Sequence, residues 1–96
     1  MTNALRVLDV SQLEPPEPLQ RALAALDILA TGDCLCLLHR REPLLLFPTL
    51  EQRGFDHITQ TMPRADNGLP VFHIYIWRRH DAQAESVARR ALNQLS

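Results

Sequence analysis

Residues 31–43 read TGDCLCLLHRREP, and this stretch decides the fold of the chain. Its centre, residues 33–40, is a nearly continuous apolar run that lies between Gly32 and the charged, proline-ended segment 41–43. A short apolar run between such boundaries is typical of a strand that is buried on both faces. We therefore expect residues 33–40 to form a central strand of a sheet.

The sequence upstream of this strand predicts a strand followed by a helix. Residues 5–10 alternate between apolar and polar side chains as a short strand does, and residues 14–18 read EPPEP. Proline suits the first turn of a helix, and apolar residues then recur at helical spacing up to Gly32. A helix from about Pro18 to about Ala30 would join two parallel strands by a crossover connection.

A second helix is expected between Pro43 and Gly54, because proline can open a helix and glycine can adopt the left-handed conformation after one. Pro48 leaves two alternatives for its start. Either the helix begins near Phe47, or it begins at Pro43 and bends where Pro48 cannot donate a hydrogen bond.

Two further strands are predicted at Phe55–Met62 and Leu69–Arg78, with a turn at residues 64–68 that contains an Asn-Gly step. The first is polar at many positions, as an edge strand is. The second presents two different faces. Phe72, Ile74 and Ile76 share one face, and Val71, His73, Tyr75 and Trp77 share the other.

The tail, residues 81–96, predicts an amphipathic helix with Asp81 as its cap and a Glu85–Arg89 pair one turn apart. It could cover the face of His73, Tyr75 and Trp77, or a second copy of the chain could cover that face. The predicted fold is thus an α/β (α+β) two-layer sandwich of order βαβαββ with a four-stranded mixed sheet. Residues 1–80 would form the domain, and residues 81–96 a helix on it or on a second subunit.

The composition excludes several classes of protein. Apolar residues make up 46% of the chain and charged residues 22%, as in a folded domain, and every apolar run, residues 44–47 included, is too short to span a membrane. The net charge of −1 disfavours non-specific nucleic-acid binding, and the two short basic clusters, residues 39–41 and 78–80, are each followed by an acid. The N-terminal residues lack the pattern of a secretory signal, so we expect a cytoplasmic protein with reduced cysteines.

Four motifs carry a resemblance to a known family. Leu8-Asp9-Val10, the Pro15–Pro18 turn, Arg41-Glu42-Pro43 and residues 50–55 resemble, in order and spacing, the TusA/SirA-like sulfur carriers. They are most similar to an uncharacterised branch of that superfamily, a domain of unknown function that is sometimes joined to hemerythrin-like domains. The resemblance covers residues 5 to 78, and the predicted C-terminal helix lies outside it.

In the sulfur carriers the turn reads Cys-Pro-x-Pro, and the resemblance implies a cysteine that carries a persulfide at the start of the first helix. In this chain Pro15 occupies that position and offers neither a thiol nor an N–H group. The resemblance therefore implies the carrier fold without its sulfur-transfer chemistry. Glu17 adds negative charge beside prolines that lack N–H donors, which disfavours a bound phosphate. Glu17 is expected to cap the helix, or else to contribute to recognition of a partner.

Cys34 and Cys36 are expected to lie on one face of the central strand, about 6.5 Å apart between Cα atoms, near the limit of disulfide reach. We interpret them as packing residues, since an apolar strand raises the pKa of a thiol. The alternative is a reactive thiol pair, or a metal site that His39 or His73 completes.

Polar residues at the end of the central strand give the first candidate for a binding site. His39, Arg40, Arg41 and Glu42 follow that strand, where open sheets with parallel strands tend to place ligands. A second possibility is proton transfer by His57, His73 and Tyr75 across neighbouring strands, although histidines held by hydrogen bonds in a packing role are the preferred interpretation.

These observations predict a non-enzymatic binding or protein-interaction module that has no cofactor and acts with a protein partner. One alternative is a diverged sulfur or redox carrier that uses Cys34 or Cys36. Another is a metal-binding accessory protein linked to hemerythrin-like or nitrogen-oxide systems. A homodimer could form through the face of His73, Tyr75 and Trp77 or through the C-terminal helix.

Overall fold

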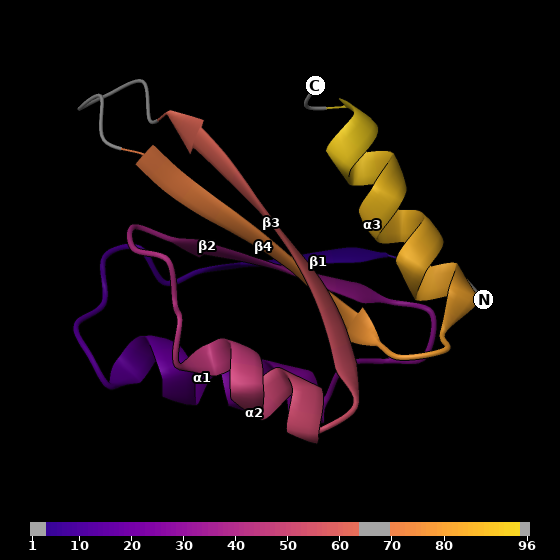
Figure 1. Ribbon diagram of the computed structural model, residues 1–96, viewed down its shortest axis with the longest axis horizontal. Coiled ribbons are helices and arrows are strands. Elements are labelled where there is room, and N and C mark those ends of the chain that lie inside the picture. Colours follow the sequence, from indigo (N-terminus) through magenta and orange to yellow (C-terminus); the bar gives the residue numbers. More distant parts are fainter. Residues whose placement is uncertain (1–3, 64–69, 95–96) are drawn as a thin grey trace.

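The computed structural model describes residues 4–63 and 70–94 (Figure 1). The elements follow the predicted order, and together they form a mixed α/β fold. They are β1 (Leu5–Asp9), α1 (Glu17–Asp27), β2 (Cys34–His39), α2 (Leu46–Gln52), β3 (Phe55–Pro63), β4 (Pro70–Arg78) and α3 (Ala82–Gln94).

The four strands form one mixed sheet in the order β1-β2-β4-β3. β1 runs parallel to β2, with Leu5 opposite Cys34, which confirms the predicted crossover through α1. β4 lies antiparallel to β2, with Tyr75 opposite Cys36, and antiparallel to β3. The apolar strands β2 and β4 are therefore interior, and the polar strand β3 is an edge strand, as its composition predicted.

One face of the sheet packs against α1 and α2, which both lie below it in Figure 1. The core on this face is made of leucines of the two helices and of alternate residues of β2 and β4. Leu26 of α1 and Leu50 of α2 are buried here with Ile74 and Ile76, which confirms that these two isoleucines share one face of β4. These contacts give the expected two-layer α+β sandwich.

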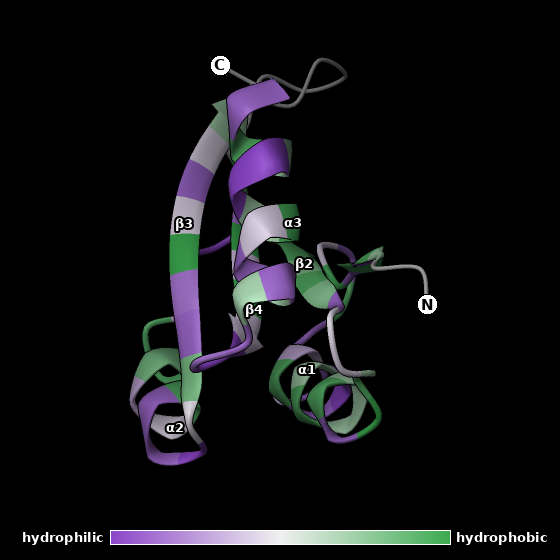
Figure 2. Ribbon diagram, turned by 90° about the vertical axis from the view of Figure 1, so that its right-hand side faces the viewer, coloured by the Kyte–Doolittle hydropathy of each residue, from purple (hydrophilic) through white to green (hydrophobic). Residues whose placement is uncertain are grey.

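The opposite face is partly covered by α3, which lies on the other side of the sheet from α1 and α2 (Figures 1 and 2). Ala84 and Ala88 are completely buried against Tyr75 and Trp77 of β4. Their small side chains let the helix approach the sheet closely. Of the two expected arrangements, the structure shows the one in which the chain's own helix covers Tyr75 and Trp77.

α1 ends at Asp27, earlier than the predicted end at Ala30. The N–H group of Leu29 donates to Leu26 O at 3.3 Å, so the chain tightens into a turn after the helix. Arg78 of β4 donates to Leu29 O at 2.6 Å and to Leu26 O at 3.4 Å, and so satisfies carbonyl groups at this helix end. Gly32 adopts a positive φ of 88° in the following turn rather than at the helix end itself.

α2 begins at Leu46, which favours the alternative in which the helix starts near Phe47. Pro48 is the third residue of the helix, where an N–H group would have no acceptor within the helix. The proline therefore costs no helical hydrogen bond, and no bend is needed. Gly54 has a φ of +84° directly after the helix, as predicted.

Asp81 caps α3, as predicted, by accepting a hydrogen bond from the N–H of Ala84 at 3.1 Å. Its other oxygen accepts the N–H of Gly32 at 2.8 Å and so joins the start of α3 to the turn before β2. The predicted pair between Glu85 and Arg89 is formed at 2.8 Å. The predicted turn at residues 64–68 lies outside the described residues. None of the described helices has the length and apolar composition needed to cross a bilayer.

Candidate functional site

A pocket of about 410 Å³ opens where β1 and β2 end. One wall is the proline turn with the start of α1, formed by Pro15, Pro16, Pro18 and Leu19. The other wall is the segment from Arg41 to Leu46, and Leu37 and His39 of β2 lie between the two walls. Most of these side chains are apolar. We call this space the proline pocket.

The proline turn forms because the chain reverses directly after β1. Ser11 donates through its N–H and its hydroxyl to the carboxylate of Asp9, at 2.9 and 2.6 Å, which closes a tight turn. α1 then begins at Glu17, with Pro18 as a buried residue of its first turn. The Pro15–Pro16 peptide bond is cis. Because proline has a restricted φ angle and no N–H group, this wall consists of rigid residues whose backbone offers few N–H donors.

The opposite wall carries exposed leucines. Because α2 begins only at Leu46, Leu44 and Leu45 stand outside the helix in a turn, with 64% and 84% of their surface exposed. Leu46, in contrast, is buried in the core. The apolar surface therefore continues from the proline pocket onto the outside of the molecule.

Charged side chains form the rim of the proline pocket. Arg40 reaches across to Glu14 at 2.9 Å and so connects the loop after β2 with the proline turn. Arg41 and Glu42 are exposed, and neither forms an ion pair with any residue in the described parts of the chain. A positive and a negative charge are thus available to a bound partner.

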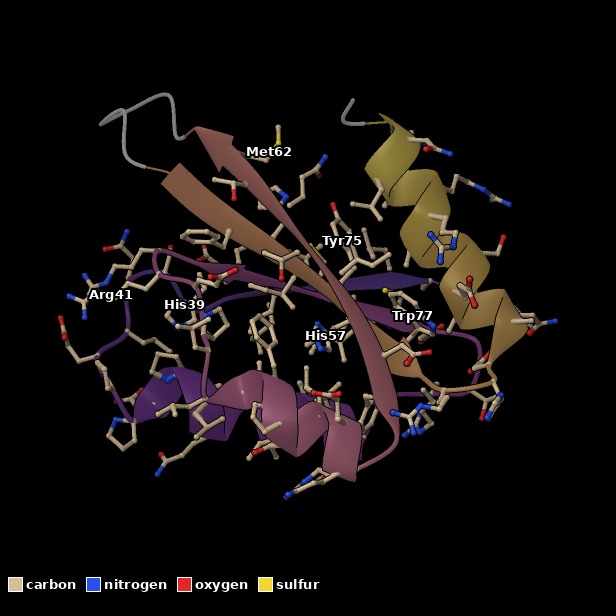
Figure 3. The ribbon with its side chains drawn as sticks, viewed as in Figure 1. His39, Arg41, His57, Met62, Tyr75 and Trp77 are labelled. Carbon is tan, nitrogen blue, oxygen red and sulfur yellow. The ribbon has the colours of Figure 1, made fainter. Side chains whose placement is uncertain are left out.

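His39 has a defined tautomer, and its surroundings favour the neutral ring. Its Nδ1 accepts the N–H of Arg41 at 3.1 Å, which assigns the ring proton to Nε2. Burial, followed by the charges of Arg40 and Arg41, lowers the pKa of His39 below its usual value. The side chain therefore supplies an uncharged N–H donor between the two walls. Figure 3 shows His39 directed toward the helices and Arg41 directed outward.

The structure brings together three of the five predicted binding residues, His39, Arg41 and Glu42, at the proline pocket. Arg40 lies beside it in its pair with Glu14, and Glu17 lies on the exposed surface of α1 within 3.7 Å of Arg21. Sequence reasoning missed the apolar walls. The available signal was the run of three leucines between Pro43 and Pro48, since a short, late-starting helix cannot bury all three.

Cys34 and Cys36 lie on the opposite face of the sheet, beneath α3. Both are free thiols, and burial raises the pKa of Cys34 to about 12 and that of Cys36 to about 11. His39 faces the other side of β2, because side chains alternate along a strand, so it cannot join them. Within residues 4–63 and 70–94 no group of three or more His, Cys, Asp or Glu side chains is arranged to hold a metal ion.

His57, His73 and Tyr75 do not form the cluster that was considered for proton transfer. His57 lies opposite Ile76 in the sheet, and its ring stacks on Phe47 of α2 at a centroid distance of 4.5 Å. His73 and Tyr75 belong to the other face, where their ring centroids are 6.5 Å apart. Figure 3 shows His57 on the side of α2 and Tyr75 on the side of α3.

Comparison with known protein families gives a match to an uncharacterised family. The family model described as "Uncharacterized conserved protein (DUF2249)" matches residues 7–78, which include both walls of the proline pocket and end before α3. No curated protein and no solved structure matches the chain.

Proposed function

This chain belongs to the DUF2249 family of uncharacterised conserved proteins, and we propose that it is a non-enzymatic protein-interaction module. The proline pocket would hold a short apolar segment of a partner protein. The observation that carries this proposal is the continuous apolar surface that runs from the pocket to the exposed side chains of Leu44 and Leu45.

The extent of this surface favours a protein partner over a small ligand. Leu44 and Leu45 line the pocket but keep 64% and 84% of their surface exposed, so a small molecule inside the pocket would leave much of that surface in water, whereas a peptide segment that crosses the pocket mouth would cover more of it. Burial of a leucine side chain contributes about 1.5–3 kcal/mol, so two leucines add several kcal/mol to binding. Exposed apolar patches of this kind commonly mark interaction sites.

The charges of Arg41 and Glu42 at the rim of the pocket would set the direction in which a partner segment binds. Arg41 and Glu42 carry opposite charges next to the apolar surface and have no competing ion pair among the described residues. A partner segment with complementary charges beside its apolar residues would dock in one direction. Substituting either residue should change the association rate and its salt dependence more than the dissociation rate.

No cysteine is among the described residues that line the proline pocket, which supports a binding role rather than sulfur transfer. If the chain has the TusA/SirA-like fold that its motifs resemble, Pro15 takes the place of the carrier cysteine and lines the proline pocket. Cys34 and Cys36 lie beneath α3 on the other face, with raised pKa values that disfavour the thiolate. The site would then retain the docking surface of the fold without its reactive group.

A library of displayed random peptides tests this proposal directly. Peptides selected on the wild-type chain should share at least two large apolar residues. The Leu44→Ser, Leu45→Ser double variant should bind the selected peptides at least tenfold more weakly, which corresponds to about 1.4 kcal/mol. Both side chains are exposed, so the variant should keep its fold.

Ile28→Ser is the matched control, because Ile28 is as exposed as Leu45 but lies at the end of α1, outside the proline pocket. It should leave peptide affinity unchanged. Single variants Arg41→Ala and Glu42→Ala should alter the salt dependence of association. Failure to enrich any apolar motif, or equal affinity for wild type and the double leucine variant, would rule out the proline pocket as the docking site.

A further inference from the structure

The outer edge of β1 presents backbone groups that no described strand pairs with. The N–H of Cys34 donates to Ala4 O at 3.0 Å, and the N–H of Val10 donates to Leu38 O at 2.9 Å. Because the direction of the backbone groups alternates along a strand, those of Arg6 and Leu8 also point to β2. The N–H and C=O groups of Leu5 and Val7 therefore point outward.

Apolar side chains flank this edge. Val7 is 60% exposed and Ile28, just after α1, is 85% exposed. Both line a groove of about 350 Å³ between β1 and the end of α1. In the described parts of the chain, the other large apolar side chains with high exposure are Leu19, Leu44 and Leu45, all at the proline pocket. The exposed apolar surface thus divides into two separate areas.

The edge at the other side of the sheet is protected. β3 is flanked by the ion pairs Asp56–Arg79 and Glu85–Arg89, and proteins use such charges to prevent further strand pairing. At β1 the one cation, Arg6, is paired with the buried carboxylate of Asp33 at 3.1 Å. β1 therefore has unpaired backbone groups and apolar flanks, without an uncompensated charge at Arg6 to protect it.

We propose that two copies of the chain pair through β1, antiparallel and about a two-fold axis at Val7, so that their sheets join into one continuous sheet. Each Val7 N–H would donate to the C=O of Val7 in the second copy, and the two valine side chains would meet. A two-fold axis at Arg6 would instead place two guanidinium groups opposite each other, which is unfavourable.

Self-complementarity favours a second copy over a foreign strand as the occupant. A two-fold pairing brings the same edge from both sides, so the outward N–H and C=O groups of Val7 in one copy meet the same groups of Val7 in the other. The strands are short, and the interface would be smaller than that of a permanent complex. The dimer should therefore form and dissociate with concentration.

The pairing has a consequence for binding. Because the two β1 strands would run in opposite directions, their ends, where the proline pockets open, would point away from each other. Both pockets would stay accessible in the dimer. The inference does not depend on the proposed function, since the two surfaces share no lining residue.

The test is the molar mass of the full chain over a concentration series by analytical ultracentrifugation. The mass of the wild type should rise from one chain toward two. Val7→Lys, a substitution at an exposed side chain, should lower the association constant at least tenfold. The control Leu45→Lys, at the proline pocket, should leave it unchanged.

Amide hydrogen exchange provides a second measurement that does not depend on a variant. The Val7 amide should exchange more slowly as the concentration rises, whereas that of Arg6, which points to β2, should not change. A wild-type chain that stays monomeric throughout would overturn the proposal. So would a dimer that Leu45→Lys abolishes and Val7→Lys leaves intact.

Discussion

The two thiols of the chain sit where water cannot reach them. Cys34 and Cys36 are covered by α3 on one face of β2, and burial raises the pKa of Cys34 from 9.0 to about 12 and that of Cys36 to about 11. In the unfolded chain both would ionise near their ordinary value. Folding therefore keeps protons on the thiols over an alkaline range in which the unfolded chain loses them.

This difference predicts that the free energy of unfolding falls as the pH rises above about 9, the ordinary thiol pKa. The stabilisation is fully present below pH 9 and is lost toward pH 11 to 12, by at most about 1.4 kcal/mol per pH unit for each thiol. Urea denaturation at a series of pH values measures it. The chain contains no lysine, so lysine titration does not obscure the alkaline range.

Tyr75 also lowers the free energy of unfolding at alkaline pH, because burial, with the neighbouring Cys36, raises its pKa to about 12. The difference in unfolding free energy between the wild type and Cys34→Ala isolates the contribution of the Cys34 thiol. The variant should lose stability less steeply between pH 9 and pH 11. If the plots of unfolding free energy against pH are parallel for the two proteins, the Cys34 thiol ionises as easily in the folded chain as in the unfolded one.

At the scale of elements, Arg78 of β4 joins the sheet to the end of α1. Its guanidinium group donates to two backbone carbonyls of that helix end and lies over the ring of Phe55, 5.7 Å from the centroid. Arg78→Ala would leave those carbonyls without this donor. We expect a loss of about 1.5–3 kcal/mol in the free energy of unfolding, the usual range for hydrogen bonds to a charged group.

The neighbouring residue provides the control. Arg79 pairs with Asp56 at 3.5 Å on the surface, and Arg79→Ala should cost less than about 1 kcal/mol. Chemical denaturation of both variants gives the comparison. Equal losses would mean that Arg78 acts only as a surface charge.

The elements also show how far the sequence could predict this structure. The apolar run of β2 and the alternation of β4 depend on local patterns, and both strands formed as predicted. The end of α1 could not be located, because its carbonyls are satisfied by Arg78, which lies far away in the sequence. The face of His57 depended on the register between β3 and β4, and a shift of one residue would reverse it.

The candidate site was predicted only in its polar part. The position of His39, Arg41 and Glu42 after the central strand was sufficient to place them at one end of the sheet. The walls of the proline pocket depend on how the proline turn and the start of α2 pack against each other. Exposure of Leu44 and Leu45 is a result of that packing, which no local pattern encodes.

At the scale of the whole molecule, α3 forms a third layer across the sheet from α1 and α2 (Figure 1). The layer depends on close approach, since Ala84 and Ala88 are completely buried against the sheet. Ala84→Leu should force the helix away and cost about 1–3 kcal/mol. Because Trp77 is the only tryptophan and lies beneath α3, its fluorescence should shift to longer wavelength as water reaches it.

Ala82→Leu adds the same side chain at the exposed start of α3 and should change neither stability nor fluorescence. The comparison also tests whether α3 packs against its own sheet in solution, as it does in the structure. An Ala84→Leu variant as stable as Ala82→Leu, with unchanged emission, would show that α3 is not held against β4 in solution.

The rigidity of the proline turn has a thermodynamic consequence for any complex that it forms. Pro15, Pro16 and Pro18 have restricted φ angles before a ligand arrives, so this wall loses little conformational entropy on binding. Most of the conformational entropy that is lost on binding is then lost by the incoming segment. Affinity should accordingly increase when that segment is itself preorganised, for example by cyclisation, without any new contact to the protein.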